Sequence, residues 1–120
     1  MSQPRHHRVQ VRRIYDPPSH DDGQRILVDR LWPRGVTKKN AHLDEWLKDV
    51  TPSTDLRHWF HSHRDAFEEF TGRYEAELEA PDAARALLHL RELAARGPLT
   101  LLTAAKDPDH SHTSVLLRQL

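Results

Sequence analysis

The sequence predicts an α/β protein in which helices are layered on a small sheet rather than packed into a bundle. Two apolar runs, 25–31 and 99–105, have the residue types of strands that are buried on both faces. Most of the predicted helix lies between them, and about three strands with about five helices are typical of α/β layering. A chain of 120 residues has the size of one domain. We expect this domain to span residues 8–120, after a disordered arm at 1–7.

The first strand is predicted over residues 9–15, where apolar and polar side chains alternate as in a half-buried strand. Pro17 and Pro18 end it, and Ser19 with Asp22 forms a capping pattern for a single helical turn that Gly23 closes. The link to the strand at 25–31 is short for a parallel crossover. Local physics therefore favours an antiparallel pair for these two strands.

A helix is predicted from Thr37 or Asn40 to residue 50, and Thr51-Pro52 ends it. Four apolar residues have the i, i+3, i+4, i+7 spacing of one helix face: Leu43, Trp46, Leu47 and Val50. A short segment that begins at Ser53 or Thr54 follows.

Three more helices are expected in the second half. Ser62 is predicted to cap a helix whose inward stripe is Phe67, Phe70, Tyr74 and Leu78, with a solvated acidic face. Asp82 opens the next helix, which Gly97 and Pro98 end. After the strand at 99–105, residues 111–120 should form a helix that docks on the sheet.

Composition excludes several classes of function. Lys and Arg total 18, as do Asp and Glu, so no net charge attracts nucleic acid or an anionic membrane. The absence of cysteine removes disulfides, thiolate nucleophiles and Cys-ligated zinc. No apolar run approaches a secretory signal or a membrane span, so we expect a cytoplasmic protein that does not bind membranes.

Both apolar runs end in polar residues, and these ends are the candidate site. Asp29, Arg30, Trp32 and Arg34 follow the first run, and Lys106, Asp107, Asp109, His110 and His112 follow the second. If the two strands are parallel, their carboxyl ends meet at one crevice, where open α/β sheets bind ligands. The first turn of the final helix would add free N–H groups that attract anions.

Each polar cluster also has a structural interpretation. Asp29 and Arg30 can form a buried bidentate pair, and Asp109, Ser111 or Thr113 can simply cap the last helix. In the functional interpretation, Arg34 and Arg30 bind a carboxylate or phosphate and Trp32 forms a flat wall. Asp29 would then be a base or would orient an arginine.

The ten histidines raise the question of a metal site, with His110 and His112 or His61 and His63 as ligand pairs. Two imidazoles at this spacing reach one metal only in an extended segment, and no metal ligand is assigned. A general acid or base role for His110 beside Lys106 is the stronger hypothesis.

The chain closely resembles the domain-of-unknown-function 488 family in its short, YeaO-like form. The resemblance covers residues 11–120 and rests on four motifs: IYDPPS, RILVDRLWPRG, WLKDVTPST and LLTAAKDPDHSH. It implies an α/β sandwich with a mainly parallel sheet, which overrules the antiparallel preference. The motif positions are Tyr15, Asp16, Pro17, Pro18, Asp29, Arg30, Trp32, Pro33, Arg34, Gly35, Trp46, Lys48, Lys106, Asp107 and His110. Longer relatives carry a cysteine in the last motif, so a thiol mechanism does not transfer to this chain.

The leading hypothesis is an anion-binding crevice for a phosphate- or carboxylate-bearing small molecule, formed by Arg30, Arg34, Lys106 and His110. Trp32, Tyr15 and Arg57, a third candidate cation, complete the ligand-binding set. If the protein is an enzyme, His110 would perform hydrolysis or proton transfer with Asp29 or Asp107 as its orienter. The alternatives are a non-catalytic interaction or nucleic-acid-binding module, through Arg5, Arg8, Arg12 and Arg13, and a His-ligated metal protein. The sequence indicates no cofactor and does not define an oligomeric state.

Overall fold

An all-parallel sheet of four strands forms the middle of the molecule in a computed structural model that describes residues 8–120. The strand order is β1-β4-β2-β3, with bounds Val9–Arg13 for β1, Gln24–Leu27 for β2, Glu45–Trp46 for β3 and Leu99–Thr103 for β4. The last strand in the chain therefore lies between the first two. This arrangement confirms the α/β fold and the parallel sheet.

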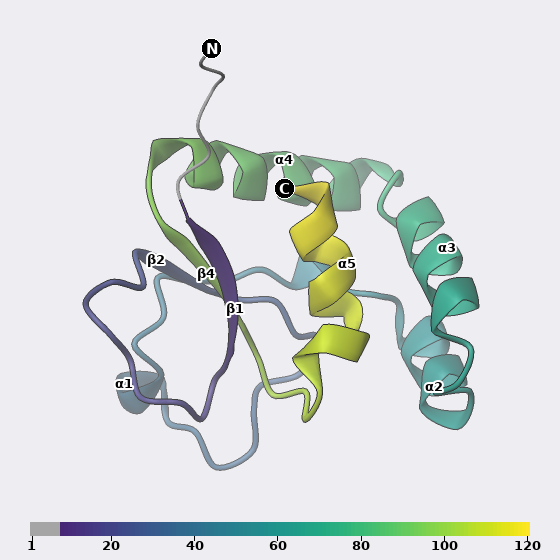
Figure 1. The fold of residues 1–120 in the computed structure, drawn as a ribbon, viewed down its shortest axis with the longest axis horizontal. Coiled ribbons are helices and arrows are strands. Elements are labelled where there is room, and N and C mark those ends of the chain that lie inside the picture. Colours follow the sequence, from purple (N-terminus) through teal and green to yellow (C-terminus); the bar gives the residue numbers. More distant parts are fainter. Residues whose placement is uncertain (1–7) are drawn as a thin grey trace.

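Five α-helices and two short 3-10 helices surround the sheet within the described residues (Figure 1). Their bounds are Lys38–Ala41 for α1, Thr54–Ser62 for α2, Phe67–Glu77 for α3, Pro81–Arg96 for α4 and His112–Gln119 for α5, with η1 at Lys48–Val50 and η2 at Pro108–His110. The predicted ends of α4 at Gly97 and of α5 near Leu120 are confirmed, as is the cap of α2 by Ser53.

The two faces of the sheet differ in what covers them. Ile26 and Val28 point into the main core, which α2, α3, α4 and α5 complete, while Leu27 points into a smaller cluster on the other face. That second cluster contains Ala41 of α1 and residues from the loops. Alternate residues of a strand point to opposite faces, so both sides of β2 are fully buried.

The antiparallel preference for the first two strands was wrong. β1 and β2 do not pair with each other, because β4 lies between them and bonds both in parallel register. Val9 and Gln24 both have Leu99 as their partner residue in β4. The link that seemed too short for a crossover has only to span one intervening strand. The length of the link between β1 and β2 gives no information about β4, which comes from the other end of the chain and lies between them.

The long helix predicted to end at residue 50 was also wrong. α1 ends at His42, whose left-handed backbone (φ 51°) turns the chain. The next residues form β3, with the Asp44 amide bonded to the Arg25 carbonyl and the Leu47 amide bonded to the Leu27 carbonyl. The four supposed helix-face residues therefore divide between two faces: Leu43 and Trp46 join the smaller cluster, and Leu47 and Val50 join the main core.

Two smaller expectations fail at turns. Ser62 is the last residue of α2 rather than a cap, and α3 begins five residues beyond it, at Phe67. Ser19 and Asp22 form a hydrogen-bonded turn in place of a helical turn: the Ser19 amide donates to the Asp22 carboxylate at 3.0 Å. The inward stripe of α3 is confirmed, since Phe70, Tyr74 and Leu78 are all buried.

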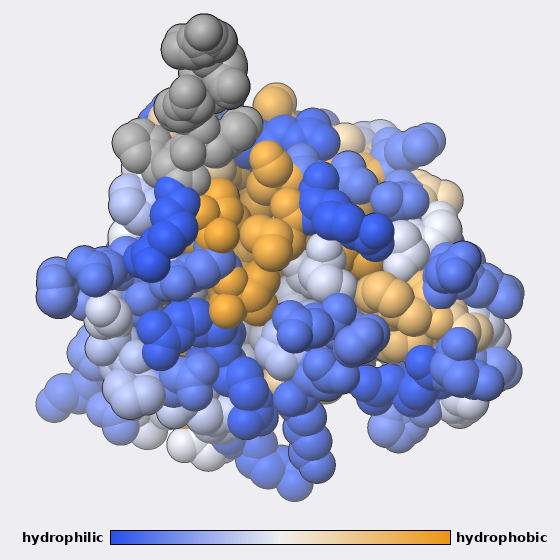
Figure 2. Space-filling model, viewed as in Figure 1, coloured by the Kyte–Doolittle hydropathy of each residue, from blue (hydrophilic) through white to orange (hydrophobic). Residues whose placement is uncertain are grey.

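The surface has two distinct regions in the view of Figure 2. Apolar side chains gather between β1 and α5, and the lower end of the molecule, where the strands end, is mostly hydrophilic. Within residues 8–120 no helix has the length and apolar character needed to cross a membrane.

Candidate functional site

A crevice of about 510 Å³ opens at the carboxyl ends of β2 and β4. Its lining includes seven residues that the sequence predicted as site residues: Tyr15, Asp29, Arg30, Trp32, Arg34, Arg57 and Lys106. They come from four separate segments of the chain. The parallel pairing of β2 with β4 explains how the first and last motifs meet, because it brings the two strand ends to the same edge.

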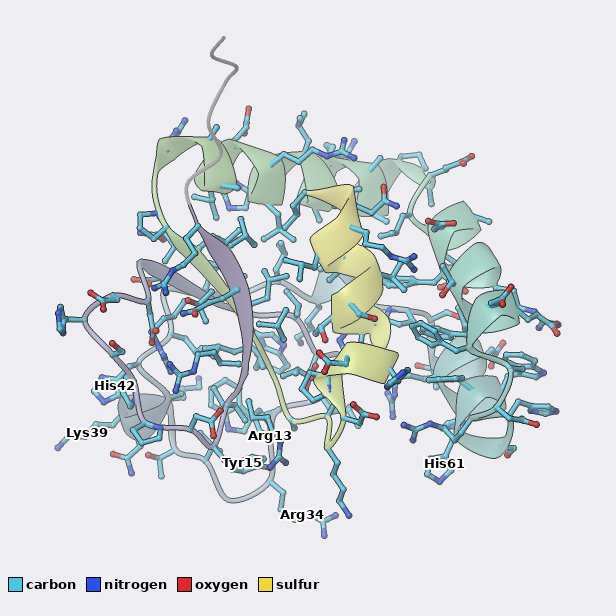
Figure 3. The ribbon with its side chains drawn as sticks, viewed as in Figure 1. Arg13, Tyr15, Arg34, Lys39, His42 and His61 are labelled. Carbon is cyan, nitrogen blue, oxygen red and sulfur yellow. The ribbon has the colours of Figure 1, made fainter. Side chains whose placement is uncertain are left out.

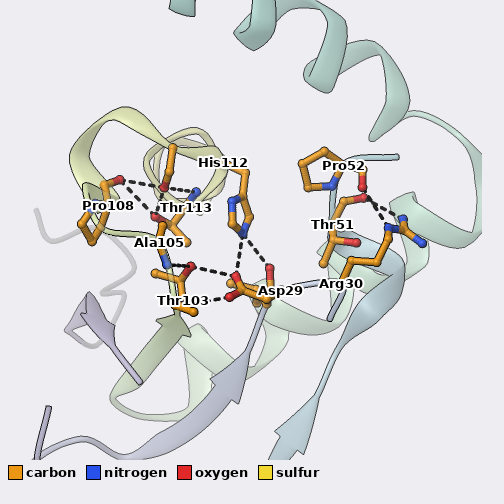
Figure 4. Close-up of polar contacts among 12 residues, drawn as sticks. Asp29, Arg30, Thr51, Pro52, Thr103, Ala105, Pro108, His112 and Thr113 are labelled. Atoms are coloured by element: carbon orange, nitrogen blue, oxygen red, sulfur yellow. Dashed lines mark hydrogen bonds and ion pairs between the residues drawn. The ribbon is translucent and has the colours of Figure 1, made fainter. Parts of the chain in front are cut away.

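Asp29 joins three elements at the inner end of this crevice (Figure 4). Its Oδ1 accepts from the Thr103 hydroxyl at 2.7 Å, and the same oxygen lies 3.1 Å from Nε2 of His112. Its Oδ2 accepts from the Ala104 amide at 2.7 Å. The carboxylate thereby ties the end of β2 to the end of β4 and to the first turn of α5. Both oxygens accept hydrogen bonds, so Asp29 holds these three elements together at the site.

These contacts determine the charge of Asp29. Burial alone would raise the pKa of its carboxyl group, but the hydrogen bond and charge of His112, with the bonds from Ala104 and Thr103, outweigh burial and lower the pKa below 3.8. The carboxylate is therefore negative at neutral pH. An anion entering the crevice must bind away from it.

His112 is oriented by two acceptors. Its Nε2 lies 2.7 Å from the Val28 carbonyl oxygen, as well as close to Asp29. Since a carbonyl oxygen only accepts, the Nε2 atom carries a proton. In the neutral ring the other nitrogen, Nδ1, is then an acceptor, and no residue in the described part of the chain bonds to it.

Arg30 does not pair with Asp29, so the structural pair considered from the sequence is not formed. The guanidinium of Arg30 donates to the backbone carbonyl of Pro52 at 3.0 Å and to that of Thr51 at 3.4 Å (Figure 4). These bonds hold the start of α2 against the end of β2. No acid neutralises the charge of Arg30 within residues 8–120.

Cations stand on two opposite walls of the crevice. Arg57, His61 and Arg64 have the i, i+4, i+7 spacing of one helix face and come from α2 and the residues just after it. Arg34 and Lys106 come from the loops after β2 and β4. In Figure 3, Arg34 and Tyr15 lie at the lower end of the molecule and His61 lies at the end of α2. The lining thus holds five Lys or Arg residues and one carboxylate, although the whole chain has no net charge.

None of these five cations forms an ion pair within the described residues. Tyr15 supports the rim instead, because its hydroxyl donates to the Arg34 carbonyl oxygen at 3.1 Å. Trp32 is fixed by its indole N–H, which donates to the Val36 carbonyl, and by an edge contact with Trp46. Two of the five cations also have contacts of their own: Arg30 donates to backbone carbonyls, and the Arg64 guanidinium lies 5.0 Å from the centre of the Phe60 ring. None of the five is neutralised by an acid among the described residues.

His110 and Asp107, predicted as catalytic residues, do not line the crevice. They contact each other, with 3.0 Å between His110 Nδ1 and Asp107 Oδ2, and both are exposed. The predicted general acid therefore has its predicted orienter, but it stands outside the cavity that holds the other candidates.

The residues of the two alternative sites, a metal site and a nucleic-acid site, are less well assembled than those of the crevice. Among residues 8–120 no three His, Asp or Glu side chains come together as a metal site would need. In the arginine cluster considered for nucleic acid, Arg5 lies outside the described residues. Arg8 donates to the Asp21 carbonyl, Arg12 lies 3.8 Å from the Asp22 carboxylate, and Arg13 donates to the Ala104 and Ala105 carbonyls.

Three crevice residues were missed as ligand-binding or catalytic candidates. His112 was placed in the polar cluster after the second apolar run, but the only role considered for it, as for His61, was that of a metal ligand. Arg64 was not considered. The sequence does contain a signal for His61 and Arg64, since they follow Arg57 at the i+4 and i+7 spacing of a helix face. His112 has a weaker signal: it directly follows the cap of α5, at the point where that helix starts against the ends of the strands.

The comparisons with known proteins agree with the family resemblance. A family model described as the inactive DUF488-N3 subclade matches residues 8–120. The uncharacterized protein YeaO of Escherichia coli is 45% identical over 108 residues, which cover 90% of this chain and 92% of that protein. The uncharacterized protein Rv3073c of Mycobacterium tuberculosis is 45% identical over 113 residues, covering 94% and 93%. No solved structure matches the chain significantly.

Proposed function

Because the chain belongs to the inactive N3 subclade of the DUF488 family, we propose that it binds a small phosphate- or carboxylate-bearing molecule in the crevice without converting it. The observation that carries the proposal is that five Lys and Arg side chains line one cavity and that none of them forms an ion pair within residues 8–120. Guanidinium groups bind carboxylate and phosphate in bidentate geometry, and an ammonium adds a point charge. An anion bound between these side chains would reduce the repulsion among their positive charges.

The absence of conversion is supported by the contacts of Asp29 and by the position of Asp107 and His110. Asp29 uses both carboxylate oxygens on Thr103, Ala104 and His112, so it orients His112 and abstracts no proton. The other acid and imidazole pair, Asp107 with His110, is outside the lining. A general base must reach its substrate proton directly or through one water.

The test is a calorimetric titration of the whole protein with inorganic phosphate and with malonate at low salt. We expect saturable binding of at least one of them. Arg34→Ala should weaken it by about tenfold, the effect of losing one charge-assisted hydrogen bond. Arg96→Ala is the matched control, because Arg96 is an exposed arginine at the end of α4, outside the crevice lining.

Two outcomes would contradict the proposal. Absence of binding by both anions would remove the anion site. Equal loss of affinity in the Arg34 and Arg96 variants would mean that general surface charge, not the crevice, attracts the anion.

A further inference from the structure

The crevice is built with its charges at the mouth and its apolar surface inside. Arg34, Lys106, His61 and Arg64 are exposed, and Arg57 is half-buried. The lining also includes Phe60 and Phe70, of which 9% and 2% are exposed, stacked on each other with 4.3 Å between ring centroids. The Arg64 guanidinium lies 5.0 Å from the centre of the Phe60 ring, so the planar surface here combines the edge of Phe60 with the face of a guanidinium. A ligand that fits this gradient has an anionic end and an uncharged end.

The inner end discriminates against a second anionic group. Asp29 is negative there, and the hydrogen bonds that stabilise its charge also hold it in place. A phosphate on the floor would therefore be repelled, whereas a neutral planar ring can lie against the exposed edge of Phe60 and the flat guanidinium of Arg64. His112 Nδ1 has no partner in the described part of the chain and offers a hydrogen-bonding atom for a polar group at the edge of that ring.

The size and charge of the crevice further restrict the class of ligand that fits it. A volume of about 510 Å³ lies within the range of pockets for drug-sized molecules, and a phosphate ion alone would leave most of it unfilled. Buried phenylalanines offer no hydrogen bonds to the many hydroxyls of a simple sugar. Cations on two walls suit a phosphate dianion better than a single carboxylate.

We propose that the crevice binds a nucleoside phosphate. The base would lie on the floor near Phe60, Phe70 and His112. The phosphate would lie between the loop residues Arg34 and Lys106 on one side and Arg57 and Arg64 on the other. This inference rests on the proposed anion-binding function and specifies its ligand class. The base supplies a planar neutral ring with N–H or carbonyl groups at its edge. The phosphate supplies the charge that the rim attracts.

The experiment is a calorimetric titration of the whole protein at one pH and low salt with four ligand classes. They are the mononucleotides AMP, GMP, CMP and UMP, the corresponding nucleosides, ribose 5-phosphate and inorganic phosphate. We expect at least one mononucleotide to bind about tenfold or more tightly than ribose 5-phosphate, because stacking of the base adds to the phosphate contacts. A five-nucleotide single strand is the further arm.

Three results would overturn the inference. If ribose 5-phosphate binds as tightly as every mononucleotide, the floor does not hold a base, while the anion site itself stands. If only the five-nucleotide strand binds, the ligand is a nucleic acid chain and not a mononucleotide. If neither phosphate nor any phosphate ester binds, the anion-binding function fails together with the inference.

A pair of variants tests the two ends separately. Arg34→Ala should weaken AMP and ribose 5-phosphate by the same factor, since both present a phosphate to the rim. Phe60→Leu should weaken the mononucleotide more than ribose 5-phosphate, because it removes the contact with the base and also the ring under Arg64. Equal losses for both ligands would contradict the placement of the base. Should Phe60→Leu fail to fold, the ratio between mononucleotide and ribose 5-phosphate in the unmodified protein still decides the question.

Discussion

Gly23 shows how one residue constrains the fold where the chain enters β2. Its backbone has φ +65°, and a Cβ built there would lie 2.1 Å from the Pro98 carbonyl oxygen. That carbonyl is held in place, because the Gln24 amide donates to it at 3.0 Å. Any side chain at position 23 must therefore push apart the starts of two paired strands.

We expect Gly23→Ala to lower the free energy of unfolding by about 2–4 kcal/mol, from a strained φ and from overpacking. Gly35→Ala is the matched control: its φ is +79°, but nothing lies within 4 Å of the added Cβ. It should cost only about 1–2 kcal/mol, from the backbone alone. Urea unfolding of both variants measures the difference. Equal losses would show that the approach to Pro98 is not what makes glycine necessary.

At this scale, sequence reasoning found the polar residues but not their partners. Asp29 and Arg30 were recognised as costly groups in an apolar strand, and pairing them with each other was the local solution. The structure gives Asp29 a partner 74 residues away, Thr103, and gives Arg30 a backbone carbonyl 22 residues away. Such choices depend on which strand lies next to β2, and a local pattern does not contain that information.

Helix α2 carries Arg57 and His61 of the crevice lining, so the contacts that fix its start also fix the position of these side chains. Ser53 caps α2 by accepting from the Leu56 amide at 3.1 Å. Its hydroxyl and its amide also donate to the Glu77 carboxylate, at 2.6 and 2.7 Å. One residue thus joins the start of α2 to the end of α3.

We expect Ser53→Ala to lower the free energy of unfolding by about 1–2 kcal/mol, because it removes the cap and one bond to a charged acceptor. Thr37→Ala removes only a cap, since the Thr37 hydroxyl accepts from the Asn40 amide of α1. That change should cost less, about 0.5–1 kcal/mol. Thermal unfolding compares the two. A larger loss for Thr37→Ala would contradict the importance of the Glu77 contact.

The elements that the sequence predicted well are those with long periodic patterns. α4 and α5 have wide apolar stripes and clear end signals, and both were found close to their expected bounds. β3 has two residues and was missed. Its apolar neighbours look like a helix face because residues pointing to opposite sides of a sheet edge can imitate a spacing of three and four.

Across the whole molecule, a hydrogen-bonded carboxylate lies at each end of the sheet: Asp22, which is buried, and Asp29, which is half-buried. Asp22, at the ends where β2 and β4 begin, is 1% exposed and contacts Arg25, Gln10 and the Ser19 amide. Asp29 stands at the ends where β2 and β4 finish. The net charge of zero does not reveal either network, because ion pairing and burial depend on where the charged residues lie and not on the total charge of the chain.

Both carboxylates make stability depend on pH, with a sign that their environments determine. For each, burial opposes ionisation, yet the hydrogen bonds and cations around it prevail and hold the pKa below the ordinary value of 3.8. The unfolded chain therefore binds protons at a higher pH than the folded protein does. Their stabilising contribution is present above about pH 4 and is lost as the pH falls through 3.8 toward the folded values.

We expect the free energy of unfolding to fall steadily between about pH 5 and pH 2, and Asp29→Asn to flatten that slope by up to about 1.4 kcal/mol per pH unit. At pH 7 the same variant should be about 2 kcal/mol less stable, because an amide cannot accept from all three partners and one of its N–H groups would face a donor. Urea unfolding across the pH range measures both effects. Asp65→Asn, at an exposed site after α2, is the control and should keep the wild-type slope. Parallel pH profiles for Asp29→Asn and the unmodified protein would mean that the carboxylate at the crevice floor does not hold the two strand ends together.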